Sequence, residues 1–393
     1  MKLKSSFSKI NILKKNAKFK KQTVYDSKLV WCTICLLLTG LVMVTSSSIS
    51  IANRIHGDLL FFAKKEILYL IIVLFLTNIF LQIPIRFWKV HSIKLFLISI
   101  ISLLLVLIVS TPINGSLRWI GSSSIHIQPS EVSKIAILCY FSDYVSRKHH
   151  EIINSFWGFL KPIGIISIIS ILLLIEPDLG TVIIYFITIL SLLFIIGAQI
   201  WKFIPIFVLG IVIIIVLTAS IPYQNKRILS FWNPWKDPFG SGYQLTQSLM
   251  ALGRGNIFGV GLGKSIQKLE YLPEAHTDFI FSIIGEELGY FGSCIILFMI
   301  LFLAFRAIKI GKKALKNNNF FSGYFAFSIG IWFISQTLIN ISTTIGILPT
   351  KGLTLPLISY GGSSLVTISI AISILLRIDF ETRMSKKIYQ GSQ

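Results

Sequence analysis

Long apolar runs alternate along this chain with short polar or basic segments. Runs such as 163–175, 181–196 and 203–221 contain no charged residue. About 20 consecutive apolar residues are enough to cross the hydrocarbon layer of a membrane as a helix. A water-soluble core could not hold so many such runs. The pattern therefore predicts an all-α polytopic membrane protein.

The apolar runs predict ten transmembrane helices with both chain termini in the cytoplasm. A basic cytoplasmic tail at 1–28 would precede a ten-helix domain at 29–378, and a second cytoplasmic tail would occupy 379–393. A large periplasmic loop, 221–277, would join the seventh and eighth helices. The predicted spans are 29–49, 67–84, 95–110, 128–144, 162–175, 181–198, 203–220, 278–304, 320–345 and 357–376.

The charge pattern supports this topology. The 393 residues carry a formal net charge of +21, which by itself is compatible with a nucleic-acid partner. However, the Lys and Arg residues gather in the first 28 residues and in alternate loops, as the positive-inside rule requires. We therefore predict no nucleic-acid partner. The sequence also shows no convincing internal repeat, which argues against a transporter built from inverted repeats.

The four cysteines all lie in apolar runs. Cysteines in such positions do not form the disulfide framework of a secreted domain. Cys32 and Cys35 have the spacing of a redox pair but no polar neighbours, so we interpret them as small apolar residues.

Acidic residues are crowded into segment 271–290, where an external loop enters an apolar run. The segment holds Glu274, His276, Asp278, Glu286 and Glu287, although the whole chain has only 16 Asp and Glu residues. Partial dehydration at such a place raises the pKa of a carboxyl group. A raised pKa suits a general base. Asp278 is the candidate general base.

A second polar group lies near the start of the fourth span. Glu131 and Lys134 are three residues apart and so share one face of a helix, and Asp178 follows the fifth span. Charges at membrane depth are costly and are often functional. We predict a network of Lys134, Glu131 and Asp178. It could be a structural staple of the bundle, part of a site, or both.

External loops supply further cations, among them Arg118, Lys268 and Lys351. His276 and Asp278 alone make a poor zinc site, so we predict no dedicated metal site. The pattern leaves open a loosely held Mg²⁺ or Mn²⁺ between Asp278 and a pyrophosphate. No Ser/His/Asp triad and no Walker loop is present.

Six motifs, in order along the chain, resemble the SEDS (shape, elongation, division and sporulation) family. The resemblance extends from about residue 25 to residue 377 and is closer to the cell-division branch than to the elongation branch. The motifs are Met-Val-Thr-Ser-Ser (43–47), Gln-Pro-Ser-Glu (128–131), Glu-Pro-Asp-Leu-Gly-Thr (176–181), Gly-Tyr-Gln-Leu-Thr-Gln-Ser (242–248), Tyr-Leu-Pro-Glu-Ala-His-Thr-Asp-Phe-Ile-Phe (271–281) and Leu-Pro-Thr-Lys-Gly-Leu-Thr-Leu-Pro-Leu-Ile-Ser-Tyr-Gly-Gly-Ser-Ser (348–364).

The resemblance implies a ten-span peptidoglycan glycosyltransferase in the bacterial cytoplasmic (inner) membrane, at the division septum. Such an enzyme polymerises lipid II outside the membrane. Its expected partners are a class B penicillin-binding transpeptidase and other membrane proteins of the division machinery. The family's essential aspartate falls on Asp278, and its supporting polar residues fall on Glu131, Lys134 and Asp178.

The residues fit this chemistry. The acceptor sugar must lose a hydroxyl proton, and one carboxylate base suffices because the pyrophosphate leaving group departs without a proton. Glycosidases, in contrast, need a second carboxyl group as acid. The leaving group instead needs positive charge. The candidate substrate-binding residues are therefore Arg118, Glu131, Lys134, Asp178, Lys268, His276 and Lys351. A flippase for a lipid-linked precursor and a non-catalytic division scaffold remain as alternatives.

Overall fold

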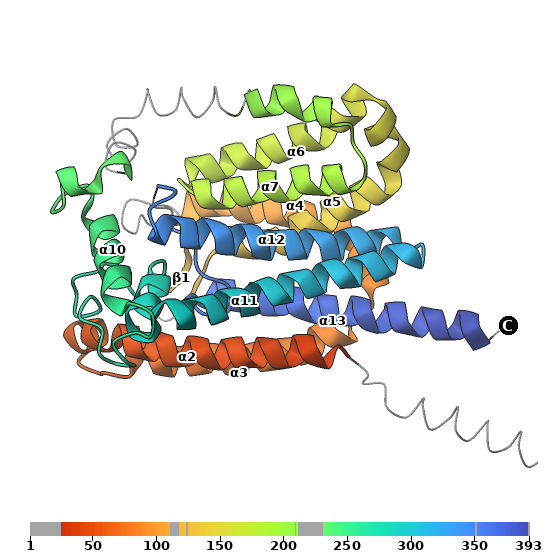
Figure 1. Ribbon diagram of the computed structural model, residues 1–393. Coiled ribbons are helices and arrows are strands. Elements are labelled where there is room, and N and C mark those ends of the chain that lie inside the picture. Colours follow the sequence, from red (N-terminus) through yellow and green to blue (C-terminus); the bar gives the residue numbers. More distant parts are fainter. Residues whose placement is uncertain are drawn as a thin grey trace, which may run out of the picture.

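The protein is a bundle of long helices (Figure 1). The computed structural model describes residues 25–110, 118–122, 125–208, 210, 231–349 and 352–391. The elements are α2 (Ser27–His56), α3 (Phe61–Gln82), α4 (Ile85–Val109), β1 (Ile120–Ser122), β2 (Ile125–Ile127), α5 (Pro129–Asn154), α6 (Phe156–Ile175), α7 (Leu179–Ile195), the 3₁₀ helices η1 (Ile200–Phe203) and η2 (Pro234–Lys236), α10 (Tyr243–Gly255), α11 (Ile280–Lys316), α12 (Phe320–Thr344) and α13 (Gly362–Gly391).

Seven of the helices in the described segments are long and apolar enough to cross a membrane, and α7 is a shorter apolar helix. The seven are α2, α3, α4, α6, α11, α12 and α13. Their outer faces expose large apolar side chains; Phe75 is 67% exposed and Ile108 is 80% exposed. Helices satisfy their own backbone hydrogen bonds, as a hydrocarbon environment requires. The chain is therefore a multi-pass membrane protein. Most of the predicted seventh span, 203–220, lies outside the described residues.

Several helices extend beyond the spans that we predicted, because charged residues continue a helix after it leaves the apolar layer. Helix α2 continues to His56 instead of ending at 49, and α4 begins at Ile85, ten residues before the predicted start. Helix α11 runs on to Lys316, and α13 to Gly391. At its start, α2 is capped by the Asp26 side chain, which accepts from a backbone N–H of the first turn.

The helices pack around two apolar cores. One core joins residues of α2, α3, α11, α12 and α13, and the other joins residues mainly of α4, α5, α6 and α7. Helix α12 lies between them and contacts α5, α7 and α11 (Figure 1). Its buried side chains include Phe325, Trp332 and Phe333. Polar side chains of α12 are therefore held in fixed places at the centre of the bundle.

Two elements were not predicted from the sequence. The strands β1 and β2 form an antiparallel hairpin just before α5. Helix α10 lies within the segment expected to be a large loop, and packs against α11 at one end of the bundle (Figure 1). Its polar and apolar residues alternate with a helical period, too briefly for a membrane span.

Helix α11 is interrupted near its start at Gly289, whose φ of +70° is accessible mainly to glycine. The interruption frees backbone groups of α11, and segment 256–261 pairs with them. Val260 and Gly261 donate to the carbonyls of Glu286 and Glu287, while Tyr290 and Phe291 donate to the carbonyls of Asn256 and Ile257, each at 3.0 Å. The loop that leads to Asp278 is thereby fastened to α11.

Candidate functional site

Asp278 lies in the loop directly before α11, not within the helix, since α11 begins at Ile280. The side chain of Asn340, on α12, fixes this loop. Its Nδ2 donates to the Asp278 carbonyl at 2.9 Å and to the Leu353 carbonyl at 2.6 Å. Asn340 is fully buried. One amide group therefore joins the Asp278 loop to the segment that precedes α13.

Asp278 is a half-buried residue, and its carboxylate accepts no hydrogen bond from any described residue. It faces Gly352 and Arg118. A Cβ at Gly352 would lie 3.3 Å from Oδ2 of Asp278 and 3.6 Å from Nη1 of Arg118. The lack of a side chain at Gly352 leaves the carboxylate and the guanidinium open to the same small region.

The pKa of Asp278 is raised to about 7, mainly by burial and to a lesser extent by the nearby negative charge of Glu274. The positive charge of Arg118 acts in the opposite direction, and Asp178 adds a smaller upward contribution. A carboxyl group with a pKa near 7 is present to a substantial fraction as the carboxylate at neutral pH. That carboxylate is a stronger base than the carboxylate of an ordinary aspartate.

Arg118 holds the turn between α6 and α7. Its Nε donates to the Glu176 carbonyl at 3.0 Å, and its Nη2 donates to the Pro177 carbonyl. The pKa of Glu176 is raised to about 8, mainly by burial and also by the negative charge of Asp178, while the positive charge of Arg118 acts to lower it. Arg118 therefore links this turn to the region around Asp278.

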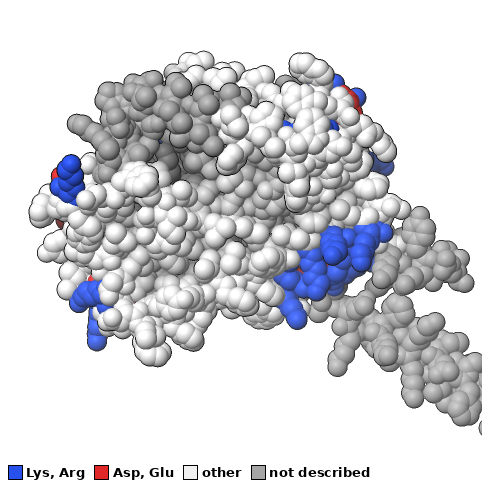
Figure 2. Space-filling view, turned by 45° about the horizontal axis from the view of Figure 1, so that its top comes forward, with Lys and Arg blue, Asp and Glu red and all other residues white. Residues whose placement is uncertain are grey.

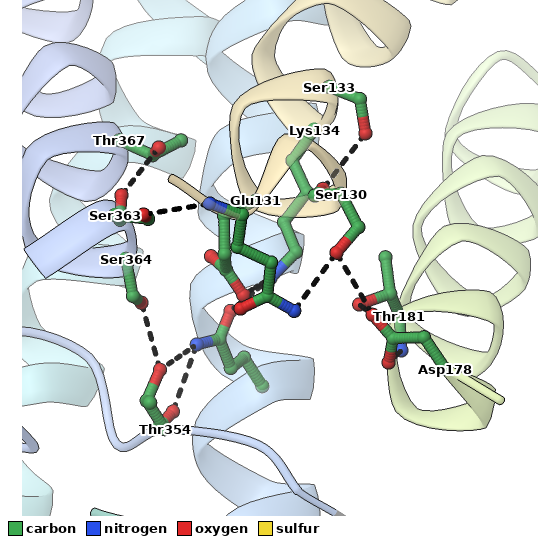
Figure 3. Close-up of polar contacts among 12 residues, drawn as sticks. Ser130, Glu131, Ser133, Lys134, Asp178, Thr181, Thr354, Ser363, Ser364 and Thr367 are labelled. Atoms are coloured by element: carbon green, nitrogen blue, oxygen red, sulfur yellow. Dashed lines mark hydrogen bonds and ion pairs between the residues drawn. The ribbon is translucent and has the colours of Figure 1, made fainter. Parts of the chain in front are cut away.

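Lys134 and Glu131 form an ion pair inside the bundle (Figure 3). Nζ of Lys134 lies 2.7 Å from Oε1 of Glu131, and the lysine side chain is completely buried. The ammonium also donates to Oε1 of Gln336 at 3.4 Å and lies 5.6 Å from the ring centroid of Trp332. Gln336 continues the chain of contacts by donating to the Thr354 carbonyl at 2.9 Å.

Asp178 contacts the other side of the first turn of α5 (Figure 3). Its Oδ2 accepts from Ser130 at 3.0 Å and from the Thr181 hydroxyl at 2.9 Å, and it caps the start of α7. The single network that we expected is thus two adjacent ones. Lys134 pairs with Glu131, whereas Asp178 is bonded to Ser130, the residue before Glu131.

The remaining candidates are dispersed. Lys268 is buried and bound to Glu287 at 2.7 Å and to Ser46 of α2 at 2.9 Å, with no described contact to Asp278. The His276 ring contacts the rings of Phe62 and Tyr360, which also contact each other, and burial lowers the pKa of His276. Lys351 lies outside the described residues.

The uncharged residues that support these groups were not predicted from the sequence. Gln336 and Asn340 are four apart on one face of α12, and they are buried amides in an otherwise apolar span. That spacing in an apolar run was the available signal. Within the described segments, no three His, Cys, Asp or Glu residues gather as metal ligands would.

Comparison with known proteins places these residues in a family context. The family model FtsW/RodA/SpoVE, described as cell cycle protein, matches residues 27–384. The chain is 68% identical over 361 residues to the probable peptidoglycan glycosyltransferase FtsW of Buchnera aphidicola subsp. Baizongia pistaciae, covering 92% of this chain and 95% of that protein. It is 53% identical over 363 residues to the protein of the same name from Escherichia coli O6:H1, covering 92% and 88%.

Solved structures share the fold. A chain of a peptidoglycan synthase complex, described as coordinating polymerization and crosslinking, matches with a TM-score of 0.76 at 23% identity and covers 91% of this chain and 98% of that chain. The rod shape determining protein RodA of Thermus thermophilus matches with a TM-score of 0.66 at 23% identity, covering 90% and 96%.

Proposed function

Because the chain belongs to the FtsW/RodA/SpoVE family of cell cycle proteins, we propose that it is a peptidoglycan glycosyltransferase that polymerises lipid II, with Asp278 as its general base. The relatives named peptidoglycan glycosyltransferase are similar over more than nine-tenths of this chain. The observation that carries the role of Asp278 is its carboxylate, which borders the open region at Gly352, accepts no hydrogen bond from described residues, and has a pKa raised to about 7.

The proposed reaction transfers one glycan unit. Asp278 removes the proton from a hydroxyl group of the acceptor sugar as that oxygen attacks the anomeric carbon of the donor. A glycosidic C–O bond forms, and the C–O bond from the anomeric carbon to the pyrophosphate breaks. The pyrophosphate leaves with the bonding electron pair and needs no proton. A positioned base of this type contributes about 10²–10⁴-fold in rate.

Among the cations in the described part of the chain, Arg118 is the best placed to assist. It borders the same region at Gly352 as the carboxylate of Asp278, and developing negative charge on a leaving group is stabilised by positive charge held in place beforehand. Lys134 and Lys268 are each neutralised by a buried glutamate, which suits a positioning role. A Mg²⁺ or Mn²⁺ ion would have to be held largely by the pyrophosphate itself.

We further propose the finer topology and setting. The protein has ten transmembrane helices with both termini in the cytoplasm, so that the Asp278 loop faces the periplasm of a bacterial inner membrane. It acts at the division septum together with a class B penicillin-binding transpeptidase. Attachment of an impermeant thiol reagent to single cysteines introduced at Thr277 and Lys312 tests the orientation. Only the first should react from outside.

The decisive test is polymerisation of lipid II by the purified protein in complex with its transpeptidase. Asp278→Asn should abolish glycan chain growth, whereas Glu274→Gln, a matched change at an exposed neighbouring acid, should retain most of it. Chain growth at a near-normal rate in the Asp278→Asn variant would refute the assignment. Lipid II crossing vesicle membranes without polymerisation, dependent on Lys134 but not on Asp278, would indicate a flippase. Normal septation with inactive Asp278 variants would indicate a scaffold.

A further inference from the structure

A basic groove of about 610 Å³ opens between the start of α4 and the middle of α5. It lies at the end of the bundle opposite Asp278. The backbone N–H of Ile85, the first residue of α4, donates to Glu381 near the end of α13 at 3.1 Å, whereas the segment before α13 reaches Asp278 through Asn340. The groove is thus separate from the site described above.

Three cations from two helices line this groove: Arg86, Lys89 and Arg147. Arg86 and Lys89 form no ion pair with any described residue. Arg147 uses Nε for Asp143, at 3.0 Å, which leaves its terminal N–H groups without a partner among the described residues. The groove therefore offers several unused N–H donors and a net positive charge.

A buried carboxylate fixes the base of the groove. Asp143 is almost fully buried, and its Oδ2 accepts from the Ser92 hydroxyl of α4 at 2.9 Å and from Arg147. These contacts join α4 to α5 and hold the arginine in place. A guanidinium held in this way loses less conformational entropy when it binds an oxyanion.

The groove cations differ from the other cations at this end of the bundle, where Lys and Arg gather beyond a broad uncharged surface (Figure 2). Lys148 and Lys161 both pair with Glu151. These two lysines are explained by the excess of positive charge that membrane proteins carry on their cytoplasmic side. The groove cations instead converge on one hollow without an acidic partner of their own, apart from the bond to Asp143.

An apolar strip begins at the edge of the groove. Val90 and Ile93, which line the groove, are 65% and 49% exposed, and Leu97 and Ile101 continue along the same face of α4 at 52% and 56%. These positions follow a helical period of three and four residues. A ligand that has both an anionic group and a long apolar chain would use the whole of this surface.

We propose that this groove binds an anionic phospholipid of the surrounding leaflet, with its phosphate between Arg86, Lys89 and Arg147 and an acyl chain along the exposed face of α4. The charge and the adjoining apolar strip together select a lipid over a free phosphate. This proposal does not depend on the proposed glycosyltransferase activity.

The test is native mass spectrometry of the full-length protein released from nanodiscs that contain phosphatidylglycerol and phosphatidylcholine. The wild type should retain phosphatidylglycerol in preference to phosphatidylcholine. Arg86→Ala/Lys89→Ala should lower the retained phosphatidylglycerol several-fold, and both side chains are exposed, so the fold is kept. Lys148→Ala/Lys161→Ala removes the same number of charges at the same end and should leave retention unchanged. Asp278→Asn should also leave it unchanged.

Equal retention by the wild type and the groove variant would overturn the proposal. So would an equal loss in both double variants, which would mean that only the total charge matters. Inorganic phosphate, added as a separate probe, should not displace the lipid at millimolar concentration. Displacement would identify a simple anion site instead.

Discussion

Asn340 donates a side-chain hydrogen bond to the backbone carbonyl of Asp278 over 2.9 Å, and the same amide group also holds Leu353 at 2.6 Å. A buried amide on a central helix thus sets the position of the proposed base and of the segment facing it. The contact is to the backbone, so it leaves the carboxylate of Asp278 free.

Asn340→Ala should reduce the rate of lipid II polymerisation by about 10- to 100-fold, because small displacements of a reacting group have effects of this size. The buried carbonyl of Leu353 and the partly buried carbonyl of Asp278 would lose a donor, which costs about 1–3 kcal/mol in stability. Thr337→Val, an isosteric change that removes a buried hydroxyl of α12, serves as the control. We expect kcat to fall more than KM rises. An unchanged kcat in a folded Asn340→Ala protein would contradict the positioning role.

The pH dependence of polymerisation should have an acidic limb near pH 7. The pKa of Asp278 is raised to about 7, mainly by burial, so the carboxylate, the active form of a base, accumulates only as the pH rises through that value. The measurement is the rate at low substrate concentration between pH 5 and pH 9. A limb near pH 4 would show that the base is an ordinary exposed carboxylate or another group.

Glu274→Gln should move that acidic limb to lower pH. The negative charge of Glu274 raises the pKa of Asp278, and removing the charge lowers it. The shift should be small and should shrink at high salt, because Glu274 is exposed and its charge is screened. Asp58→Asn removes an exposed acid that does not act on Asp278 and should leave the limb in place. A shift of the limb to higher pH in Glu274→Gln would contradict the electrostatic assignment.

Arg118→Met should move the limb in the opposite direction, to higher pH, because the positive charge of Arg118 lowers the pKa of Asp278. The rate above the limb should also fall, since the turn at Glu176 and Pro177 loses two hydrogen bonds. Arg118→Lys keeps the charge but not the paired donors. Arg118→Lys should return the acidic limb to its wild-type pH more fully than it returns the rate to its wild-type value. The difference between the two variants separates the electrostatic effect of Arg118 from its effect on the position of the turn.

Lys134→Met should destabilise the protein by about 3–5 kcal/mol, because it leaves the buried Glu131 carboxylate without its partner. Glu131→Gln/Lys134→Met removes both charges, and its loss of stability should be smaller than the sum of the two single changes. Thermal unfolding in detergent gives the stability, and lipid II polymerisation gives the function. A stable but inactive double variant would show that the pair does more than staple α5 to α12.

The spans were predictable because a bilayer requires long apolar runs, and the exposed apolar faces of α3 and α4 agree with that requirement. The ends of the helices were less predictable, since charged residues such as Lys316 continue a helix as readily as they end one. Helix α10 is short and half polar, so its pattern gave no membrane signal.

The charged members of the site stand out in an apolar sequence, but their partners do not. The sequence predicts Lys268 as a substrate-binding cation, and only the folded chain brings it to Glu287, 19 residues away, and to Ser46, on another helix. The role of Asn340 depends on a backbone contact, and no pattern of side chains records such contacts.

Substitutions of two glycines in α10 test whether packing of α10 against α11 positions the loop before Asp278. A Cβ at Gly255 would lie 1.8 Å from the Gly285 carbonyl oxygen, far closer than non-bonded carbon and oxygen atoms can approach, whereas a Cβ at Gly253 meets nothing within 4 Å. Gly255→Ala should therefore push α10 away from α11, speed proteolysis of the loop and lower the rate of polymerisation. Gly253→Ala, on the same helix, should leave the rate unchanged and stabilise α10 by up to about 1 kcal/mol, because alanine favours a helix over glycine. Equal effects of the two substitutions would mean that the close contact between α10 and α11 does not position Asp278.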